Sequence, residues 1–367
     1  MIQRRLLAAA VTAVLIAAGC AGDGAPVSTP ASPTGAASVS PSAAASGTPT
    51  AGRPVEAAPA TEAGASRPPG PARLEVFPVP PGSRPHDVAP AVDGGVWYTA
   101  QGAAALGWLD PATGETVHIA LGAGSRPHGV IVDAVGDAWV TDGGLNAIVR
   151  VDGETHEVSV YPLPDSRPNA NLNTATFDGR GVLWFTGQNG IVGRFDPATE
   201  EMVVLDAPRG RGPYGIAATA AGDVYFASLA GSYVGHIDTE NDVITVLEPP
   251  TAGQGARRVW PDSQGRIWVS EWNAGAVAMY DPATAEWREW TLPGVAARAY
   301  SVYVDEFDRI WLSDFASNTL LTFDPESETF ESHQLFGDPA NVRQLLGRDG
   351  EVWGAESAAD QLVVVRF

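Results

Sequence analysis

The sequence contains no lysine and only one cysteine among its 367 residues. A single cysteine excludes an internal disulfide, an iron–sulfur cluster and a zinc site built on thiolates. All 22 basic residues are arginines, and the formal net charge is −21. Because phosphate backbones repel so acidic a chain, we expect no nucleic-acid partner. The sequence also lacks a phosphate-binding loop, a Gly-x-Ser-x-Gly turn and a His-Glu-x-x-His helix.

The apolar segment near the N-terminus is too short to cross a bilayer comfortably. It follows two arginines, spans Leu6–Ala18 with Thr12 as its one polar residue, and leads through small residues to Cys20. Such a segment resembles a bacterial lipoprotein signal peptide. We therefore predict a signal peptide at 1–19, a lipid-modified Cys20 and an extracytoplasmic protein that contacts the membrane only through this anchor. A secretory signal with an incidental cysteine is the alternative.

Residues 21–72 have a strongly biased composition. Ala, Gly, Pro, Ser and Thr fill 44 of these 52 positions, and no aromatic residue occurs. Such a segment cannot bury enough apolar surface to offset the entropy lost on ordering. We predict that residues 20–72 form a disordered tether and that residues 73–367 form the folded domain.

One sequence unit recurs seven times from residue 73 onward, and an aromatic residue marks each copy. The markers are 41 to 45 residues apart: Trp97, Trp139, Trp184, Tyr225, Trp268, Trp311 and Trp353. Around each marker, apolar residues alternate with polar ones, and Gly/Asp turns separate short β-branched segments. A four-strand repeat of this length is typical of a propeller blade. We predict an all-β, seven-bladed propeller with four-stranded blades, in which the markers pack between blades.

The two ends of the folded domain complement each other. The seventh unit ends at Phe367 after its third strand, so its outer strand is missing. The segment Leu74–Pro78 has the side-chain pattern of the outer strand Val158–Pro162. We predict that this N-terminal strand completes the last blade and leaves no open edge. We also expect a monomer.

The repeat predicts which side chains meet at one mouth of the central channel. These are the residues eleven before and three after each marker, because both positions lie at the same rim. The first set is His86, His128, Asn173, Tyr214, Arg257, Tyr300 and Val342. The second set is Ala100, Asp142, Gly187, Ser228, Glu271, Asp314 and Glu356. An insertion in the third unit makes Asn169 an alternative to Asn173. Such groups suit acid–base or metal chemistry, but a polar rim can also be merely solvated.

Two of the six histidines share the local sequence Ser-Arg-Pro-His in adjacent units. Neighbouring innermost strands would bring His86 and His128 close enough to share one ligand. We predict surface or packing roles for the other histidines. His118, His156 and His333 fall on or beside outer strands, and His236 falls on a third strand.

The repeat, with Pro127–Val130 leading to Trp139–Asp142, resembles the virginiamycin B lyase (streptogramin lyase) family over residues 73–367. The resemblance implies a magnesium-dependent elimination that opens the ring of type B streptogramins at its ester bond without water. It also implies His128 as the base, His86 as a substrate-binding residue and Asp142 as a magnesium ligand. Where the family has a second acidic ligand, this chain has Arg126, which cannot bind a cation.

Three functions are compatible with these residues. The first is a metal-assisted lyase that opens a cyclic ester or depsipeptide. The second is a non-catalytic propeller at the cell envelope that binds a small molecule, peptide, glycan or partner protein, with Tyr214 and Tyr300 as contacts. In an enzyme, these two tyrosines and Arg257 would bind the substrate. The third is a lactonase-type hydrolase, which requires several carboxylates around one calcium ion.

Overall fold

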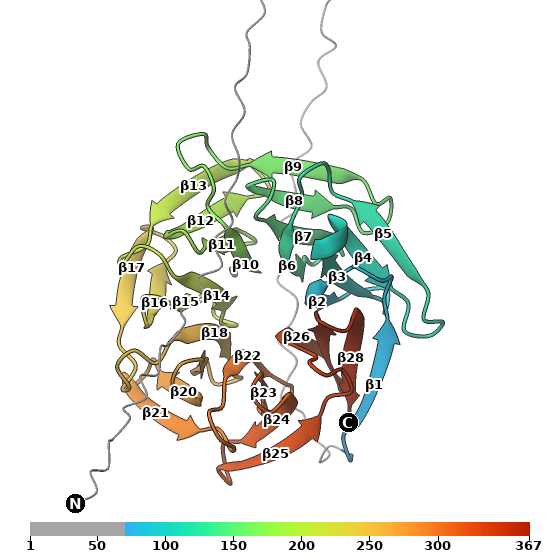
Figure 1. Ribbon diagram of the computed structural model, residues 1–367. Coiled ribbons are helices and arrows are strands. Elements are labelled where there is room, and N and C mark those ends of the chain that lie inside the picture. Colours follow the sequence, from blue (N-terminus) through green and yellow to red (C-terminus); the bar gives the residue numbers. More distant parts are fainter. Residues whose placement is uncertain (1–69) are drawn as a thin grey trace, which may run out of the picture. The chain divides into compact units, whose positions relative to one another are not determined.

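Alternating apolar residues and Gly/Asp turns build seven antiparallel sheets around one axis (Figure 1). The computed structural model describes residues 70–367. The predicted signal peptide, Cys20 and the tether up to residue 69 lie outside the described residues, so they stay predictions. Within residues 70–367, no helix has the length and hydrophobicity needed to cross a bilayer.

Each blade has four strands, which follow one another from the channel outward. Blade one is β2 (Pro85–Pro90), β3 (Val96–Ala100), β4 (Ala105–Leu109) and β5 (Thr116–Ala120). Blade two is β6 (Pro127–Val132), β7 (Ala138–Asp142), β8 (Ala147–Val151) and β9 (Val158–Pro162). Blade three is β10 (Leu172–Phe177), β11 (Leu183–Gly187), β12 (Ile191–Asp196) and β13 (Glu201–Asp206). Blade four is β14 (Pro213–Ala218), β15 (Val224–Ser228), β16 (Tyr233–Asp238) and β17 (Val243–Leu247).

Blades five to seven follow the same plan. Blade five is β18 (Ala256–Pro261), β19 (Ile267–Glu271), β20 (Ala276–Asp281) and β21 (Glu286–Thr291). Blade six is β22 (Ala299–Val304), β23 (Ile310–Asp314), β24 (Thr319–Asp324) and β25 (Thr329–Gln334). Blade seven is β26 (Val342–Arg348), β27 (Glu351–Glu356), β28 (Gln361–Arg366) and β1 (Arg73–Pro78). A single 3-10 turn, η1 (Gln101–Ala103), is the one helical element among residues 70–367.

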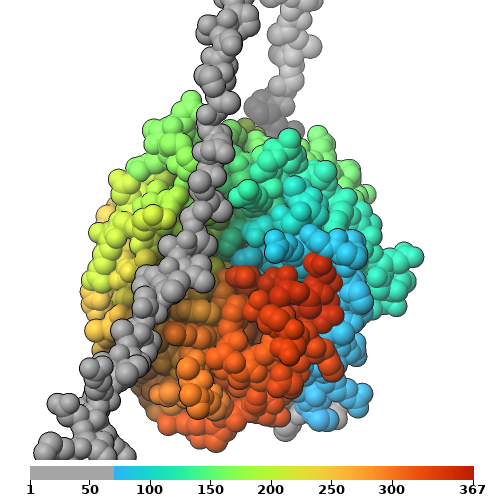
Figure 2. All heavy atoms as spheres, in the orientation of Figure 1, coloured from blue at the N-terminus to red at the C-terminus, as the bar shows by residue number. Residues whose placement is uncertain are grey.

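The predicted closure is confirmed. Strand β1 pairs antiparallel with β28, from Arg73 opposite Arg366 to Pro78 opposite Gln361. In the space-filling view the blue N-terminal strand lies against the red C-terminal blade (Figure 2). The last blade therefore contains both ends of the folded domain. Strand β1 supplies the outer strand that is missing after β28.

The marker aromatics are buried between neighbouring sheets, as predicted. Trp268 of blade five, for example, packs with Val302 and Leu312 of blade six. Its indole Nε1 donates to the Asp262 carboxylate, 2.9 Å away, in the turn that precedes its strand. Each marker residue removes a large apolar surface from water. The indole N–H groups of the marker tryptophans have carboxylate partners in the same way, except that of Trp97, which has no partner among residues 70–367.

Hydroxyl side chains connect the innermost strands of neighbouring blades. Thr99 Oγ1 of blade one donates to the His128 carbonyl of blade two at 2.8 Å. Ser270 Oγ of blade five likewise donates to the Tyr300 carbonyl of blade six at 2.8 Å. These bonds fix the height of each innermost strand relative to the next, which sets the positions of the side chains at the channel mouth.

Candidate functional site

Seven side chains ring the mouth of the channel, each from the second residue of an innermost strand. These ring positions are His86, His128, Asn173, Tyr214, Arg257, Tyr300 and Arg343. Six match the sequence prediction, and Asn173 rather than Asn169 is the member from blade three.

The prediction of Val342 for blade seven is wrong by one residue. Val342 pairs with Glu356, as Pro85 pairs with Ala100 in blade one, so Arg343 takes the ring position. The cause is a shorter turn. Leu346 pairs with Trp353, seven positions later, whereas the equivalent residues of blade one are eight positions apart.

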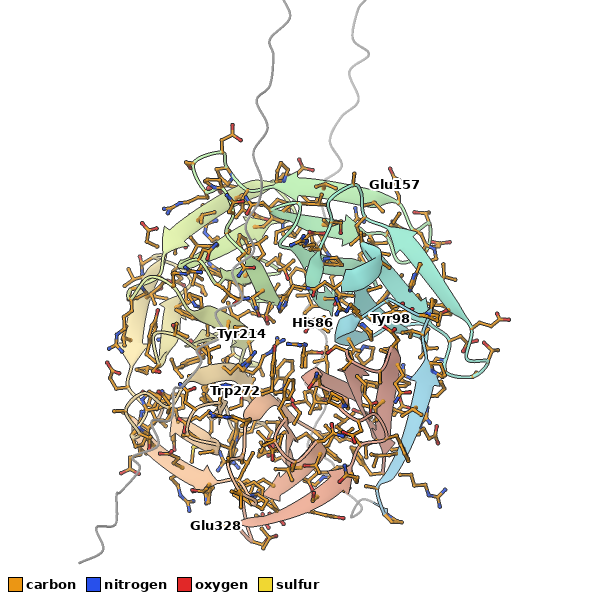
Figure 3. All side chains as sticks on the ribbon, viewed as in Figure 1. His86, Tyr98, Glu157, Tyr214, Trp272 and Glu328 are labelled. Atoms are coloured by element: carbon orange, nitrogen blue, oxygen red, sulfur yellow. The ribbon has the colours of Figure 1, made fainter. Side chains whose placement is uncertain are left out.

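A pocket of about 620 Å³ opens at this mouth. His86, His128, Tyr214 and Arg343 line it, together with the exposed Arg84. Figure 3 shows His86 and Tyr214 near the centre of the ring. The pocket therefore places two imidazoles, a phenol and a guanidinium within reach of one ligand.

An ion pair crosses the channel beneath this pocket. Arg258 Nη2 lies 3.0 and 3.2 Å from the two carboxylate oxygens of Asp87, 171 residues away in sequence. Both side chains are almost fully buried, with exposed fractions of 4% and 1%. On its other side, Asp87 Oδ1 lies 2.7 Å from His86 Nδ1. Because an ionised carboxylate only accepts, the imidazole of His86 carries its proton on Nδ1.

The same arginine reaches the second histidine through two intermediates. Arg258 Nη1 donates to Thr174 Oγ1 at 2.7 Å, and that hydroxyl donates to Asn173 Oδ1 at 2.8 Å. With its oxygen engaged, Asn173 directs Nδ2 at His128 Nε2, 3.1 Å away. A guanidinium has no acceptor atom, so one arginine fixes the direction of every bond in both chains.

These directions give the two histidines different roles. His128 uses its Nε2 lone pair as an acceptor, so its proton is on Nδ1, which is buried and has no partner within residues 70–367. His86 has its proton on Nδ1, so the lone pair is on Nε2. That Nε2 makes no hydrogen bond within the described residues, and His86 lines the pocket. The free imidazole lone pair at the mouth therefore belongs to His86.

Both imidazoles are neutral at pH 7. Burial lowers the pKa of His86, although Asp87 beside it acts in the opposite direction. Burial, and the charge that a protonated His86 would bring, lower the pKa of His128 well below its usual range. Burial alone would raise the pKa of Asp87, but Arg258 holds it far below its ordinary value. The neutral imidazole of His86 is thus hydrogen-bonded to the ionised carboxylate of Asp87.

Arg257 and Tyr300, predicted as substrate contacts, are enclosed by each other. The guanidinium carbon of Arg257 lies 3.4 Å from the ring centroid of Tyr300 and 4.5 Å from that of Trp272. Tyr300 is 1% exposed and Arg257 9%. Tyr214 differs, because it lines the pocket while its hydroxyl lies 2.5 Å from that of Tyr300. Of these three residues, Tyr214 alone lines the mouth pocket.

The two tyrosines differ in acidity. Burial raises the pKa of Tyr214 to about 12. Burial would also raise the pKa of Tyr300, but Arg257, Arg343 and Arg258 outweigh it and lower the value. Of the two hydroxyl groups that share this hydrogen bond, that of Tyr300 is therefore the more acidic.

Asp142, the predicted magnesium ligand, is not brought to the histidines. Its Oδ1 accepts from the backbone N–H groups of Arg126, Gly144 and Leu145 at 2.8 to 2.9 Å. Its Oδ2 accepts from the Ser125 hydroxyl at 2.5 Å. The carboxylate thus ties the loop before β6 to the end of β7, and Arg126 contributes its backbone there.

The other rim carboxylates do not converge on one point either. Asp314 accepts from the backbone N–H of Arg298 at 2.7 Å, and Glu356 from that of Gly337 at 3.2 Å. Glu271 is fully buried, and burial together with the nearby Glu289 raises its pKa to about 9. None of the three lines the mouth pocket, so they do not form the carboxylate shell that a calcium-dependent hydrolase requires.

Magnesium does not fit the groups at this mouth. The ligand atoms of His86, Asp87 and His128 lie within 4.8 Å of one another, the one such cluster among residues 70–367. Magnesium prefers oxygen ligands, and the one carboxylate of this cluster is already paired with Arg258 on both oxygens. A divalent cation would have to displace that guanidinium and sit beside its charge.

Asp87, Arg258 and Arg343 belong to this candidate site, and the repeat did not predict them there. The first two directly follow the ring positions His86 and Arg257, and they are the charged members of an otherwise uncharged set of channel-filling residues. Two opposite charges at equivalent repeat positions are a signal that the sequence contains. The sequence does not show that these two charges pair across the ring, because that depends on which blades face each other.

The fold and site define a seven-bladed propeller with a histidine-based site at one channel mouth. A profile of the virginiamycin B lyase family matches residues 62–285, and the chain belongs to that family. Among solved structures, the virginiamycin B lyase of Staphylococcus aureus superposes with a TM-score of 0.75 at 18% identity, over 81% of this chain and 99% of that one.

Two further structures show how widely this fold is shared. A streptogramin B lyase gives a TM-score of 0.73 at 23% identity, over 80% of this chain and 97% of the other. The Kuenenia stuttgartiensis hydrazine synthase gives 0.67 at 12% identity, over 78% and 97%. No curated protein matches the sequence. Likeness at this level establishes the fold alone.

Proposed function

We propose that this protein is a lyase that opens a cyclic ester or depsipeptide by elimination, with His86 as the general base. One observation carries the proposal: the neutral imidazole of His86 lines the mouth pocket with Nε2 unpaired among residues 70–367, while its Nδ1–H is held by the ionised Asp87. A base whose far nitrogen is fixed by a carboxylate is oriented for proton abstraction, and its protonated form is stabilised.

The reaction balances without water. His86 Nε2 takes a proton from the carbon next to a carbonyl group of the substrate. The electron pair of that C–H bond forms a C=C bond, and the adjacent C–O bond of the ester breaks. The carboxylate leaves with the bonding electrons, and His86 later returns its proton to solvent. Asp87 stays ionised throughout because Arg258 holds it.

The family resemblance gives the base role to His128, whereas the hydrogen bonds favour His86. The lone pair of His128 Nε2 accepts from Asn173, so that atom is not free to take a proton. The rings of His86 and His128 lie 3.9 Å apart between centroids. We propose that His128 limits the movement of the His86 ring and lines the substrate pocket.

Turnover of a type B streptogramin tests both the activity and the base. The full chain is expected to give a linear product with the mass of the macrocycle, whereas a hydrolase would add one water. His86→Asn should lower kcat about 10²–10⁴-fold, and His128→Asn should act mainly on KM.

For the full chain, kcat should fall in acid, because His86 must be neutral and its lowered pKa places the decline below pH 6.5.

Two results would contradict this assignment. An intact macrocycle at high enzyme concentration would remove the lyase proposal. A loss of kcat in His128→Asn that exceeds the loss in His86→Asn would return the base role to His128. Mass spectrometry of the product and initial-rate kinetics read out both.

We also propose that the chain is held at the outer face of the membrane by acylated Cys20. The support is the sequence of residues 1–20. Cys20→Ala is expected to move the protein from the membrane fraction to the soluble fraction without changing its unfolding temperature. An unchanged membrane fraction would contradict the anchor.

A further inference from the structure

We propose that Arg343 forms an oxyanion site at the channel mouth, where it takes the place that a divalent cation has in the elimination implied by the family resemblance. The ligand group is a carboxylate or an enolate oxygen of the substrate. The inference rests on the proposed function and names the residue whose positive charge stabilises the negative charge that develops on the substrate.

Two hydrogen bonds hold the Arg343 guanidinium in place. Its Nε donates to Ser357 Oγ at 3.0 Å, and its Nη1 donates to the Tyr300 hydroxyl at 3.3 Å. Ser357 Oγ donates in turn to the Asn341 carbonyl at 3.0 Å, so it is free to accept from the arginine. Nη2 has no partner among residues 70–367, and the half-buried side chain lines the mouth pocket. A fixed guanidinium thus offers an unused donor to a ligand.

The mouth is locally positive although the chain as a whole is strongly acidic. Beside Arg343 stand Arg84 at the pocket wall and Arg257 and Arg258 beneath it. The carboxylates that oppose these four guanidinium groups are Asp87, which is paired with Arg258, and Asp360. Asp360 accepts from the backbone N–H groups of Gly82 and Arg84 at 2.7 Å each, and it forms no ion pair with Arg343.

This arrangement fits the chemistry of the elimination. Removal of a proton next to a carbonyl places negative charge on the carbonyl oxygen, and the leaving group is itself a carboxylate. A preorganised guanidinium in a partly enclosed pocket stabilises such charge, and its Nη2 can donate to a carboxylate oxygen. His86 and Arg343 occupy ring positions of adjacent blades, one and seven, so base and oxyanion donor face the same pocket from neighbouring strands.

Titration of the full chain with inorganic phosphate tests the site without turnover. We expect phosphate to shift the ¹H resonances of His86 and His128. The apparent Kd should rise at least about tenfold in Arg343→Gln, as expected for losing a charge-assisted contact worth about 1.4 kcal/mol or more. Arg343→Lys should bind with intermediate affinity. Arg288→Gln is the matched control, because that exposed arginine lies on the outer strand β21 and does not line the pocket, and its Kd should change less than threefold.

Manganese supplies the second arm, because a paramagnetic cation broadens the resonances of any group that binds it. We expect Mn²⁺ to leave the His86 and His128 signals sharp. The proposal is overturned if phosphate does not bind, if it binds equally well to Arg343→Gln, or if Mn²⁺ broadens both histidines. These results are independent of lyase turnover, so a failed streptogramin assay with Arg343-dependent phosphate binding would reject the activity and retain the oxyanion site.

Discussion

Replacing Arg258 with methionine is expected to lower the free energy of unfolding by about 3–5 kcal/mol, because the change leaves the Asp87 carboxylate buried and unpaired. Both partners are almost entirely removed from solvent, so water cannot replace the lost guanidinium. Thr174 also loses its donor. Urea unfolding of the full chain measures the change.

The matched control for this substitution is the double variant Arg258→Met/Asp87→Leu. Because both charges are then absent, we expect most of the lost stability to return. Catalysis should not return, because His86 loses the carboxylate that fixes its Nδ1–H. The free energy of unfolding of Arg258→Met could instead lie within about 1 kcal/mol of that of the unchanged protein. In that case Asp87 has another partner, and breaking the buried pair does not destabilise the protein as expected.

The Arg258→Met variant also separates positioning from packing. Arg258 makes no hydrogen bond to either histidine, and it acts on both through Asp87 and through Thr174 and Asn173. Imidazole ¹⁵N shifts report which nitrogen of each ring carries the proton. We expect a single tautomer for each of His86 and His128 in the unchanged protein and mixed tautomers in the variant, a change that a merely structural arginine would not cause.

The binding-module alternative has less support from the geometry than from the sequence. Tyr300 and Arg257 were expected to contact a ligand, yet they are buried against each other and against Trp272. Their role is to hold Tyr214 and Arg343 at the mouth through hydrogen bonds. An adhesive surface would present such aromatic rings to solvent. The pocket is lined instead by two imidazoles, a phenol and guanidinium groups, together with smaller polar side chains.

The sequence predicted most of the features that depend on the repeat. A fixed period identifies equivalent positions, so six of the seven ring residues follow from counting back from the markers. The outer strand of the last blade follows from the pattern of Leu74–Pro78. The count fails once, at Arg343, because the turn before Trp353 is one residue shorter and no local signal distinguishes that turn from its counterparts.

The contacts within the site could not be predicted, because they depend on directions in space. An aspartate three residues after a marker has the same sequence signature whether it binds a metal or caps backbone N–H groups, and Asp142 does the second. The Asp87–Arg258 pair joins blades one and five across the ring, a distance that no period encodes. The tautomers of the two histidines follow only once both chains of donors from Arg258 are known.

Deleting β1 is expected to abolish cooperative folding of the propeller. Strand β28 would lose its partner along six residues, and its outward edge would present unpaired N–H and C=O groups. Leu74 and Val76 would no longer cover Val363 and Val365 in the core cluster of blade seven. The lost pairing and burial approach the total stability of a typical domain, about 5–15 kcal/mol.

A second, longer truncation serves as the control for the deletion of β1. Removing residues 21–69, which the sequence predicts to be a tether, should shift the unfolding temperature by less than about 2 °C, because a change below about 1 kcal/mol has that effect in a domain of this size. The variant without residues 73–78 should instead show no cooperative transition in calorimetry and should aggregate through its open edge. A cooperative transition at the original temperature would mean that pairing of β1 with β28 does not close the ring, and the shared channel mouth would lose its structural basis.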